Sequence, residues 1–399
     1  MNEEEISRLL KAIPGARRAA NGVLLQTEDG NTFHVQGVLS SAETEGLNGE
    51  EHFFVAFCAR GEILRLRAIR NAHDYLLRMR AMAIVDSPRT VRVMRKRREV
   101  YESTGRPWAL THYYHSLDKF HKAYIDSLPR AHARKLKSVP SGLLPITDAN
   151  AACVASLTGE VVVVSESLYY FYYFMTVAVF GKNLEIGMAD RANAVLIAFR
   201  LMNQSEALDF DLDPRGALPP KTEARVQALV FDQMQFTFGH EYAHYLCGHT
   251  STASVSLPGN QATARAFACD LEFEADFQAI NLVRQTPSVA ERIAQGGMFA
   301  LIFLDLLYRL KGQHGLRSLP VSETHPAPIE RLWALHRTLG SRSPMSAMDI
   351  EHSIAVCTQL VDAFSKLLED SPRADVLTFY GSIYLPSYTE KLKIDRIDF

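Results

Sequence analysis

Two histidines four residues apart constrain this chain more than any other feature. The segment His240-Glu241-Tyr242-Ala243-His244 has the spacing H-E-x-x-H. On a helix with 3.6 residues per turn, positions i and i+4 are neighbours on one face, so both imidazoles can reach one metal ion. Zn²⁺ accepts such nitrogens at about 2.0–2.1 Å, and Glu241 would lie beside a water that the ion activates. The segment therefore predicts a zinc site with a general base.

The residues before this segment predict a long and largely buried helix. Apolar residues recur near a helical period from residue 226 to residue 238, and neither proline nor glycine interrupts residues 224–238. Two histidines and a glutamate that face a protein interior are costly unless a partner satisfies them. A bound metal ion would be such a partner.

A catalytic zinc site takes a third protein ligand. One known arrangement places glycine three residues after the second histidine and a histidine three residues later, but Cys247 and Thr250 occupy these positions. The other arrangement takes an acid from a second helix, and residues 270–279 offer acids within an apolar helical pattern. Glu272 and Asp276 share a face there, so one could bind the ion while the other accepts the outer N–H of a histidine.

Two further acids of this run are weaker ligand candidates. Glu274 lies about 160° around the helix from the pair Glu272 and Asp276, and Asp270 lies at its beginning. Cys247 and Cys269 flank the two segments, and a thiolate ligand is one interpretation of them. The other interpretation is packing, because free cysteine is among the most buried residue types.

These segments resemble the gluzincin metallopeptidases, and more closely the family of HtpX-type and CAAX prenyl proteases. The segment Glu272-x-x-Ala275-Asp276 is similar to the E-x-x-A-D of that family. The resemblance implies that His240, His244 and Glu272 bind one zinc ion, and that Asp276 braces a histidine. It also implies a mainly helical metallopeptidase core that acts on peptide bonds.

Two more segments carry the same resemblance. Thr324-His325-Pro326 with Arg331 is similar to the family's H-P-x-x-x-x-R, which implies that His325 stabilises the oxyanion and that Arg331 is structural or orients acidic groups. Asn150-Ala151-Ala152 precedes a valine-rich strand at 161–164 and looks like the family's edge strand, which pairs with a bound peptide.

Each of these segments also has a plainer interpretation. The pair His325 and Pro326 can simply open a helix. Asn150 can be a turn residue ahead of a strand. Arg331 lies on the amphipathic run 329–339, where a solvated or salt-bridged face is expected.

Membrane members of the resembled family carry hydrophobic spans, and this sequence offers only short or interrupted candidates. Residues 168–180 fall below the roughly 20 that a spanning helix needs, and residues 298–308 contain Asp305. Both runs predict buried helices. The acidic start without a signal peptide and the five scattered cysteines without C-x-x-C spacing predict a cytoplasmic protein.

Positive charge is concentrated in one region. Residues Arg60 to Lys137 hold 19 Lys plus Arg against 7 Asp plus Glu, a balance of +12, which leaves −14 elsewhere for the total of −2. The densest part is Arg89–Arg98. This region could bind an acidic partner, or it could be a solvated connecting helix. Nucleic acid is the less favoured partner, because no finger, helix-turn-helix or aromatic platform accompanies the charge.

The sequence predicts an α+β fold with a mainly helical zincin-type core, a small edge sheet and a small, partly β N-terminal module. Residues 1–70 form the antiparallel module, with hairpins at 21–39 and 53–66. A helix over 71–84 opens the basic helical connecting region at 71–139. The catalytic core at 140–345 and a C-terminal helical extension at 346–399 follow.

The predicted function is a zinc-dependent endopeptidase, in which Glu241 removes a proton from an activated water. Two alternatives stay open. One is a peptidase of the Lit phage-exclusion type, which cleaves a host protein. The other is a non-catalytic zinc sensor or adaptor that binds an acidic partner through its basic region. In that case Glu241 would have no role, and structural zinc sites usually have four protein ligands.

Overall fold

The computed structural model describes residues 3–19, 22–26, 30, 32–35, 44–202, 204, 206, 208–212, 218–249, 261–284, 286–314 and 326–370. Contacts divide the chain into two compact units, Met1–Val55 and Ala56–Phe399. The fold is mainly helical α+β with two small sheets, which confirms the predicted class. Among the described residues, no helix has both the length and the apolar character that a membrane crossing requires.

The first unit begins with one helix and a three-stranded antiparallel sheet. Helix α1 (Glu3–Ala12) is followed by β1 (Arg17–Ala19), β2 (Gly22–Gln26) and β3 (Thr32–Val35), in the order β1-β2-β3. Leu24 opposes His34 in the β2–β3 pair. The predicted hairpin within residues 21–39 is therefore confirmed.

The second predicted hairpin, at 53–66, is wrong. These residues belong to the short 3-10 helix η1 (Glu51–Phe54) and to α3 (Arg60–Arg67). The Glu62 carboxylate accepts a hydrogen bond from the Ala59 N–H at 2.9 Å, which closes the first turn of α3. It also accepts one from the Leu110 N–H at 2.9 Å. Glu62 thus fixes a helix where the apolar alternation had indicated strands.

The second unit continues with a run of helices and a three-stranded sheet. The helices are α4 (Ala72–Val85), α5 (Pro88–Ser103), α6 (Leu110–His115), α7 (Lys119–Asp126) and α8 (Arg130–Leu136). The predicted helix over 71–84 is confirmed as α4. The strands are β4 (Ser141–Leu144), β5 (Ala151–Ser156) and β6 (Gly159–Ser165), in the order β4-β6-β5. Strand β6 pairs parallel with β4 and antiparallel with β5, so β5 lies at an edge of this sheet.

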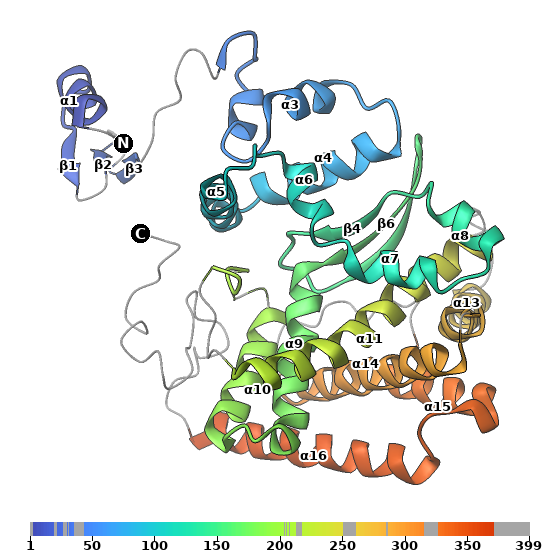
Figure 1. Ribbon diagram of the computed structural model, residues 1–399. Helices are drawn as coiled ribbons and strands as arrows, with labels where there is room; N and C mark the ends of the chain where they lie inside the picture. The colour runs from blue at the N-terminus through green and yellow to red at the C-terminus, as the bar shows by residue number, and fades with distance from the viewer. Residues whose placement is uncertain are drawn as a thin grey trace. The chain divides into compact units, whose positions relative to one another are not determined.

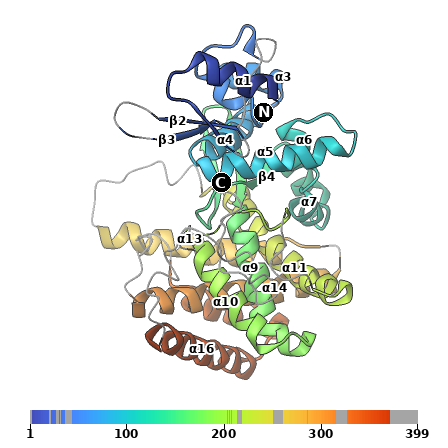
Figure 2. The ribbon, with the colours of Figure 1, turned by 90° about the vertical axis from the view of Figure 1, so that its left-hand side faces the viewer.

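The remaining helices form the bulk of the second unit (Figures 1 and 2). They are α9 (Glu166–Phe180), α10 (Met188–Met202), α11 (Pro220–Leu246), α13 (Gln261–Asn281), α14 (Pro287–His314), α15 (Pro328–Leu339) and α16 (Ala347–Asp370). Two 3-10 turns, η2 (Gly181–Leu184) and η3 (Gly340–Arg342), accompany them. The predicted helices at 168–180 and 298–308 are confirmed within α9 and α14.

Helix α11 is the central element of this unit. It packs against α13, α14, α9 and α7 and against strands β5 and β6. Its residues from Gln233 to Ala243 are all buried. Close packing with α14 depends on Gly296, where an added Cβ would lie 2.5 Å from the backbone carbon of Asp232. The glycine lets the two helix backbones approach, and α11 is held along its length.

Two arginines of the basic region, Arg80 and Arg97, are buried and stabilise the packing of the second unit. Arg97 is buried, and its guanidinium donates to Glu166 at 3.1 Å and to Asp211 at 2.9 Å. Arg80 is also buried and donates to the Leu143 carbonyl at 3.0 Å. These arginines connect α4 and α5 to β4, α9 and the chain ahead of α11, and the charge of Arg97 is compensated by Glu166 and Asp211.

Substituting Gly296 with alanine should destabilise the second unit. The new Cβ would overlap the α11 backbone, and overpacking of this kind costs about 1–3 kcal/mol. The free energy of unfolding in urea would measure the loss. Gly61 in α3 is the control, because no atom lies within 4 Å of its Cβ position. Alanine at Gly61 should raise the free energy of unfolding by about 0.5–1 kcal/mol. Equal stability of the two variants would contradict this account of the α11–α14 contact.

Candidate metal centre

Two helices bring three potential metal ligands together in the second unit. His240 and His244 lie near the end of α11, and Glu272 lies on α13. The Nε2 atoms of the two histidines are 3.1 Å apart. Glu272 lies 3.3 Å from His240 Nε2 through Oε2, and 3.4 Å from His244 Nε2 through Oε1. We call these three residues the first cluster.

The distances within the first cluster fit the shell of one small metal ion. Ligands at about 2.0–2.1 Å from a tetrahedral Zn²⁺ are separated by roughly 3.3 Å. The three donor atoms all face one another within 4.8 Å. Two imidazoles and one carboxylate are a ligand set typical of catalytic zinc, which keeps a further position for water. The residues therefore fit a zinc ion.

Asp276 contacts the outer side of His240. Its Oδ1 lies 2.9 Å from His240 Nδ1. Arg331 on α15 donates to both oxygens of this carboxylate, at 2.6 Å to Oδ1 and 2.8 Å to Oδ2. With Nδ1 engaged by Asp276, His240 turns Nε2 toward His244 and Glu272. This contact fixes the orientation of a candidate ligand histidine, as outer partners of metal-binding histidines do.

Charge around His240 favours a cation at this place. Burial and Arg331 lower the pKa of His240, but Asp276 and Glu272 raise it more, to about 10. Burial raises the pKa of the Asp276 carboxyl, yet Arg331 and His240 hold it below its ordinary value. Asp276 thus stays ionised, and its negative charge attracts a cation to His240.

His244 has a different outer partner, which the sequence did not indicate. Its Nδ1 lies 2.9 Å from Nδ1 of His249. The other nitrogen of His249, Nε2, lies 3.3 Å from Oε2 of Glu274 on α13. His249 is buried although it follows the end of α11. The sequence analysis had assigned no role to His249, and nothing in its spacing reveals the contact.

Glu241 and the edge strand lie on one cavity with the first cluster. The cavity has a volume of about 180 Å³, and its lining includes Asn150, Ala151, Glu241 and Arg331 together with His240 and Glu272. Tyr172 of α9 lines it as well, and sequence reasoning had missed this residue. Burial raises the pKa of Tyr172 to about 12, so its hydroxyl is protonated at neutral pH and can donate a hydrogen bond.

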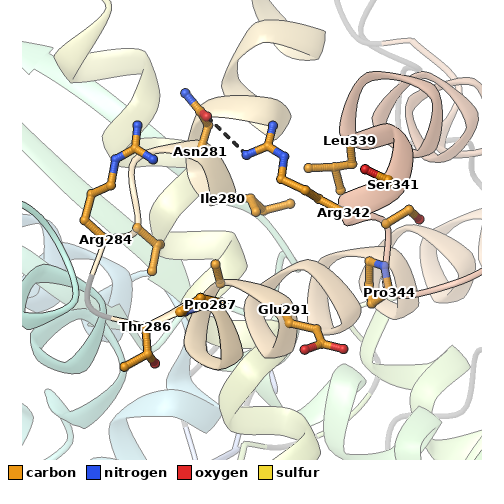
Figure 3. A pocket seen from close by; sticks show the side chains of 13 residues that line it. Ile280, Asn281, Arg284, Thr286, Pro287, Glu291, Leu339, Ser341, Arg342 and Pro344 are labelled. Carbon is orange, nitrogen blue, oxygen red and sulfur yellow. Dashed lines mark hydrogen bonds between the residues drawn. The ribbon is translucent and has the colours of Figure 1, made fainter.

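A larger cavity lies at the ends of α13 and α15 and the beginning of α14 (Figure 3). Its volume is about 470 Å³. Its lining carries Arg284, Glu291 and Arg342, and Arg342 donates to Asn281 at 3.5 Å. None of the metal-site residues predicted from the sequence lines it. Size alone therefore does not mark the functional site.

The structure tests some of the remaining site residues predicted from the sequence. His325 lies outside the described residues, so its predicted role stays a prediction. Arg331 is paired with acids, which excludes a solvated face. Asp270 is exposed and Glu274 contacts His249, so neither lies in the first cluster. Cys247 is exposed, and the interpretation of this thiol as buried packing is wrong because α11 ends there.

Comparison with known proteins gives one match. Residues 190–348 match the family model Peptidase U49. This segment contains both histidines, Glu241, Glu272, Asp276 and Arg331. No curated protein and no solved structure matches the chain. The match supports a peptidase.

Replacing Arg331 with glutamine should strongly destabilise the second unit. Asp276 is 1% exposed, and removing one partner of a buried ion pair costs about 3–5 kcal/mol. Urea unfolding near neutral pH would measure this loss. Lys96→Gln is the control, because Lys96 and Glu99 form an exposed pair whose loss should change stability little. A stable Arg331→Gln protein would contradict the described role of Arg331.

Proposed function

We propose that this chain is a zinc-dependent endopeptidase that hydrolyses peptide bonds in a protein substrate. The convergence of His240, His244 and Glu272 carries the proposal, and the match to Peptidase U49 supports the class of reaction. A bound zinc ion would supply Lewis acidity and lower the pKa of a water to about 7.

The side chains around the cavity have distinct roles in this proposal. Glu241 accepts the proton of the attacking water and passes it to the leaving amine. Tyr172 donates a hydrogen bond to the developing oxyanion from the α9 side of the cavity. His325 remains the donor that the family resemblance implies. Asp276 and Arg331 position His240 and do not contact the substrate.

Strand β5 is the proposed substrate platform. The Ser165 N–H donates to the Asn150 carbonyl at 2.8 Å, so the pair Asn150–Ser165 is hydrogen bonded. In an antiparallel ladder the next residue turns its main-chain groups to the opposite side. Ala151 and Cys153 therefore direct these groups away from β6. The Ala151 N–H already donates to Asn150 Oδ1 at 2.9 Å, so an extended peptide could pair by strand addition with the Ala151 carbonyl and with both main-chain groups of Cys153, beside the cavity that holds Glu241.

The family match favours a particular peptidase interpretation. Peptidase U49 comprises Lit-like peptidases, so cleavage of a host protein is the second candidate function within the same chemistry. The resemblance to HtpX-type and CAAX prenyl proteases remains a statement about the ligand segments. A cytoplasmic location remains part of the proposal.

The non-catalytic alternative has weaker support. A zinc sensor or adaptor would use the region Arg60–Lys137 to bind an acidic partner, but Arg80, Arg89 and Arg97 of this region are buried. Such a protein would also have no use for Glu241 in a cavity beside the metal ligands. We keep an acidic partner as a proposal for the exposed part of this region.

Glu241→Gln should abolish hydrolysis and leave metal binding intact. The amide cannot accept a proton from water, and loss of a general base costs about 10²–10⁴-fold in rate. The measurement is cleavage of a mixture of unfolded proteins by the zinc-loaded protein, with metal content determined in parallel. Removal of the metal by a chelator should abolish cleavage as well, and added zinc should restore it.

Asp232→Asn provides the matched control for this experiment. Asp232 lies on the same helix and outside the cavity lining, so its amide variant should cleave like the unmodified chain. Unchanged cleavage by Glu241→Gln would refute the general-base role. Chelated protein that still cleaves would refute the zinc mechanism.

Cys153→Pro should weaken binding of a protein substrate while the protein stays folded. Proline removes an N–H that faces away from β6, and edge strands tolerate proline in that position. We expect a higher KM with kcat changed less. Ala152→Pro is the control, because its N–H faces β6 and its loss should destabilise the strand. An unchanged KM in Cys153→Pro would contradict strand addition at β5.

A further inference from the structure

A second group of potential metal ligands lies directly beside the first cluster. Cys247, His249 and Glu274 each offer a donor atom, and these atoms lie within 4.8 Å of one another. We call these residues the second cluster. Gly248 separates the cysteine from the histidine with a φ of +75°, a left-handed conformation that favours glycine. This turn places His249 beside His244.

The donors of the second cluster suit a zinc-type ion. Thiolate, imidazole and carboxylate are all zinc ligands, at about 2.3 Å for sulfur and 2.0–2.2 Å for nitrogen and oxygen. The corresponding distances between ligands around a tetrahedral ion are roughly 3.3–3.8 Å. Cys247 is exposed and the Glu274 side chain is 48% exposed. An ion can therefore reach this place from solvent, and small side-chain movements would complete the ligand set.

One hydrogen bond joins the two clusters. His244 Nδ1 and His249 Nδ1 are 2.9 Å apart, and only one of them can carry the shared hydrogen. A metal ion on His244 Nε2 requires that hydrogen on His244 Nδ1. His249 then carries its own hydrogen on Nε2, which points to Glu274. A metal ion on His249 Nε2 requires the opposite arrangement, with hydrogen on His249 Nδ1 and on His244 Nε2.

We propose that Cys247, His249 and Glu274 form a second site for a zinc-type divalent ion, and that an ion bound there weakens metal binding at the first cluster. Binding at the second cluster releases the Cys247 proton and the Nε2 proton of His249 to solvent. The shared hydrogen moves from His244 Nδ1 to His249 Nδ1, and His244 takes up a proton from solvent at Nε2. His244 Nε2 then carries a hydrogen and has no lone pair for a metal. Because the first cluster is the proposed catalytic site, the second ion is an inhibitor, and this part rests on the proposed function.

Cobalt titration of the metal-free full-length protein tests the site without any activity measurement. A cobalt ion at the second cluster should give a thiolate-to-cobalt charge-transfer band in the near ultraviolet, which nitrogen and oxygen ligands at the first cluster do not give. Cys247→Ser should lose this band and keep the first ion. The affinity of Cys247→Ser for the second cobalt ion should fall at least 10–100-fold, roughly the loss that follows when a residue that only supports a metal ligand is removed.

Cys269→Ser is the matched control, because Cys269 lies on α13 outside both clusters. Its cobalt spectrum should equal that of the unmodified chain. A missing charge-transfer band in the unmodified chain, or a band that survives in Cys247→Ser, would overturn the second site.

His244→Ala tests the link between the clusters. Removal of this ring frees His249 from the shared hydrogen bond, so the charge-transfer band should appear at a cobalt concentration lower by about 5–150-fold, the range of typical coupling between sites. An unchanged titration would overturn the coupling.

The activity arm uses excess zinc. Zinc beyond one equivalent should inhibit cleavage by the unmodified chain, and Cys247→Ser should keep its basal activity and resist this inhibition. Inhibition that is equal in both would overturn the regulatory role. A protein that binds cobalt as expected but never cleaves would refute the proposed function and leave the second site supported.

Discussion

The buried contact between Asp276 and Arg331 supports the whole candidate site. Helix α11 carries polar side chains through the interior of the second unit, and such groups are costly unless each has a partner. Asp276 gives His240 its partner, and Arg331 compensates the charge of Asp276. Through these two contacts α11, α13 and α15 are connected at one point. The mutual orientation of His240, His244 and Glu272 follows from this connection.

The two histidines of the first cluster have different kinds of outer partner. His240 faces an ionised carboxylate, to which the Arg331 guanidinium also donates. His244 faces a neutral ring, whose further partner, Glu274, is half exposed. A neutral His240 beside Asp276 can have one tautomer only. The hydrogen shared by His244 and His249 can move from one ring to the other while both rings stay neutral. The orientation of His240 is therefore fixed, whereas the tautomer of His244 can change with that of His249.

Much of this site could be predicted from the sequence because its spacing is local. His240 and His244 are one helical turn apart, and so are Glu272 and Asp276, which makes each pair visible to a helical period. His249 and Tyr172 could not be found in this way. Gly248 has a left-handed conformation, and this turn places His249 beside His244 of α11. Tyr172 reaches the cavity only through the tertiary packing of α9.

The fold shows the same division between local and distant effects. The hairpin at β2–β3 and the helices α4, α9, α11 and α13 follow from patterns within the sequence. The helix α3 does not, because the alternation in residues 53–66 favours strands and a single carboxylate, Glu62, decides for a helix through contacts with α6. Likewise Arg97 belongs to a run of positive charge, yet its partners Glu166 and Asp211 lie far along the chain.

The position of Arg331 has a consequence for biosynthesis. His240, His244 and Glu272 are all translated before α15, yet Asp276 forms its ion pair with Arg331 only when residue 331 has been made and packed. A growing chain that ends earlier would bury an acid without its counterion. The ribosome thus completes His240, His244 and Glu272 before their arrangement becomes stable, which delays assembly of the candidate centre until α15 has been made.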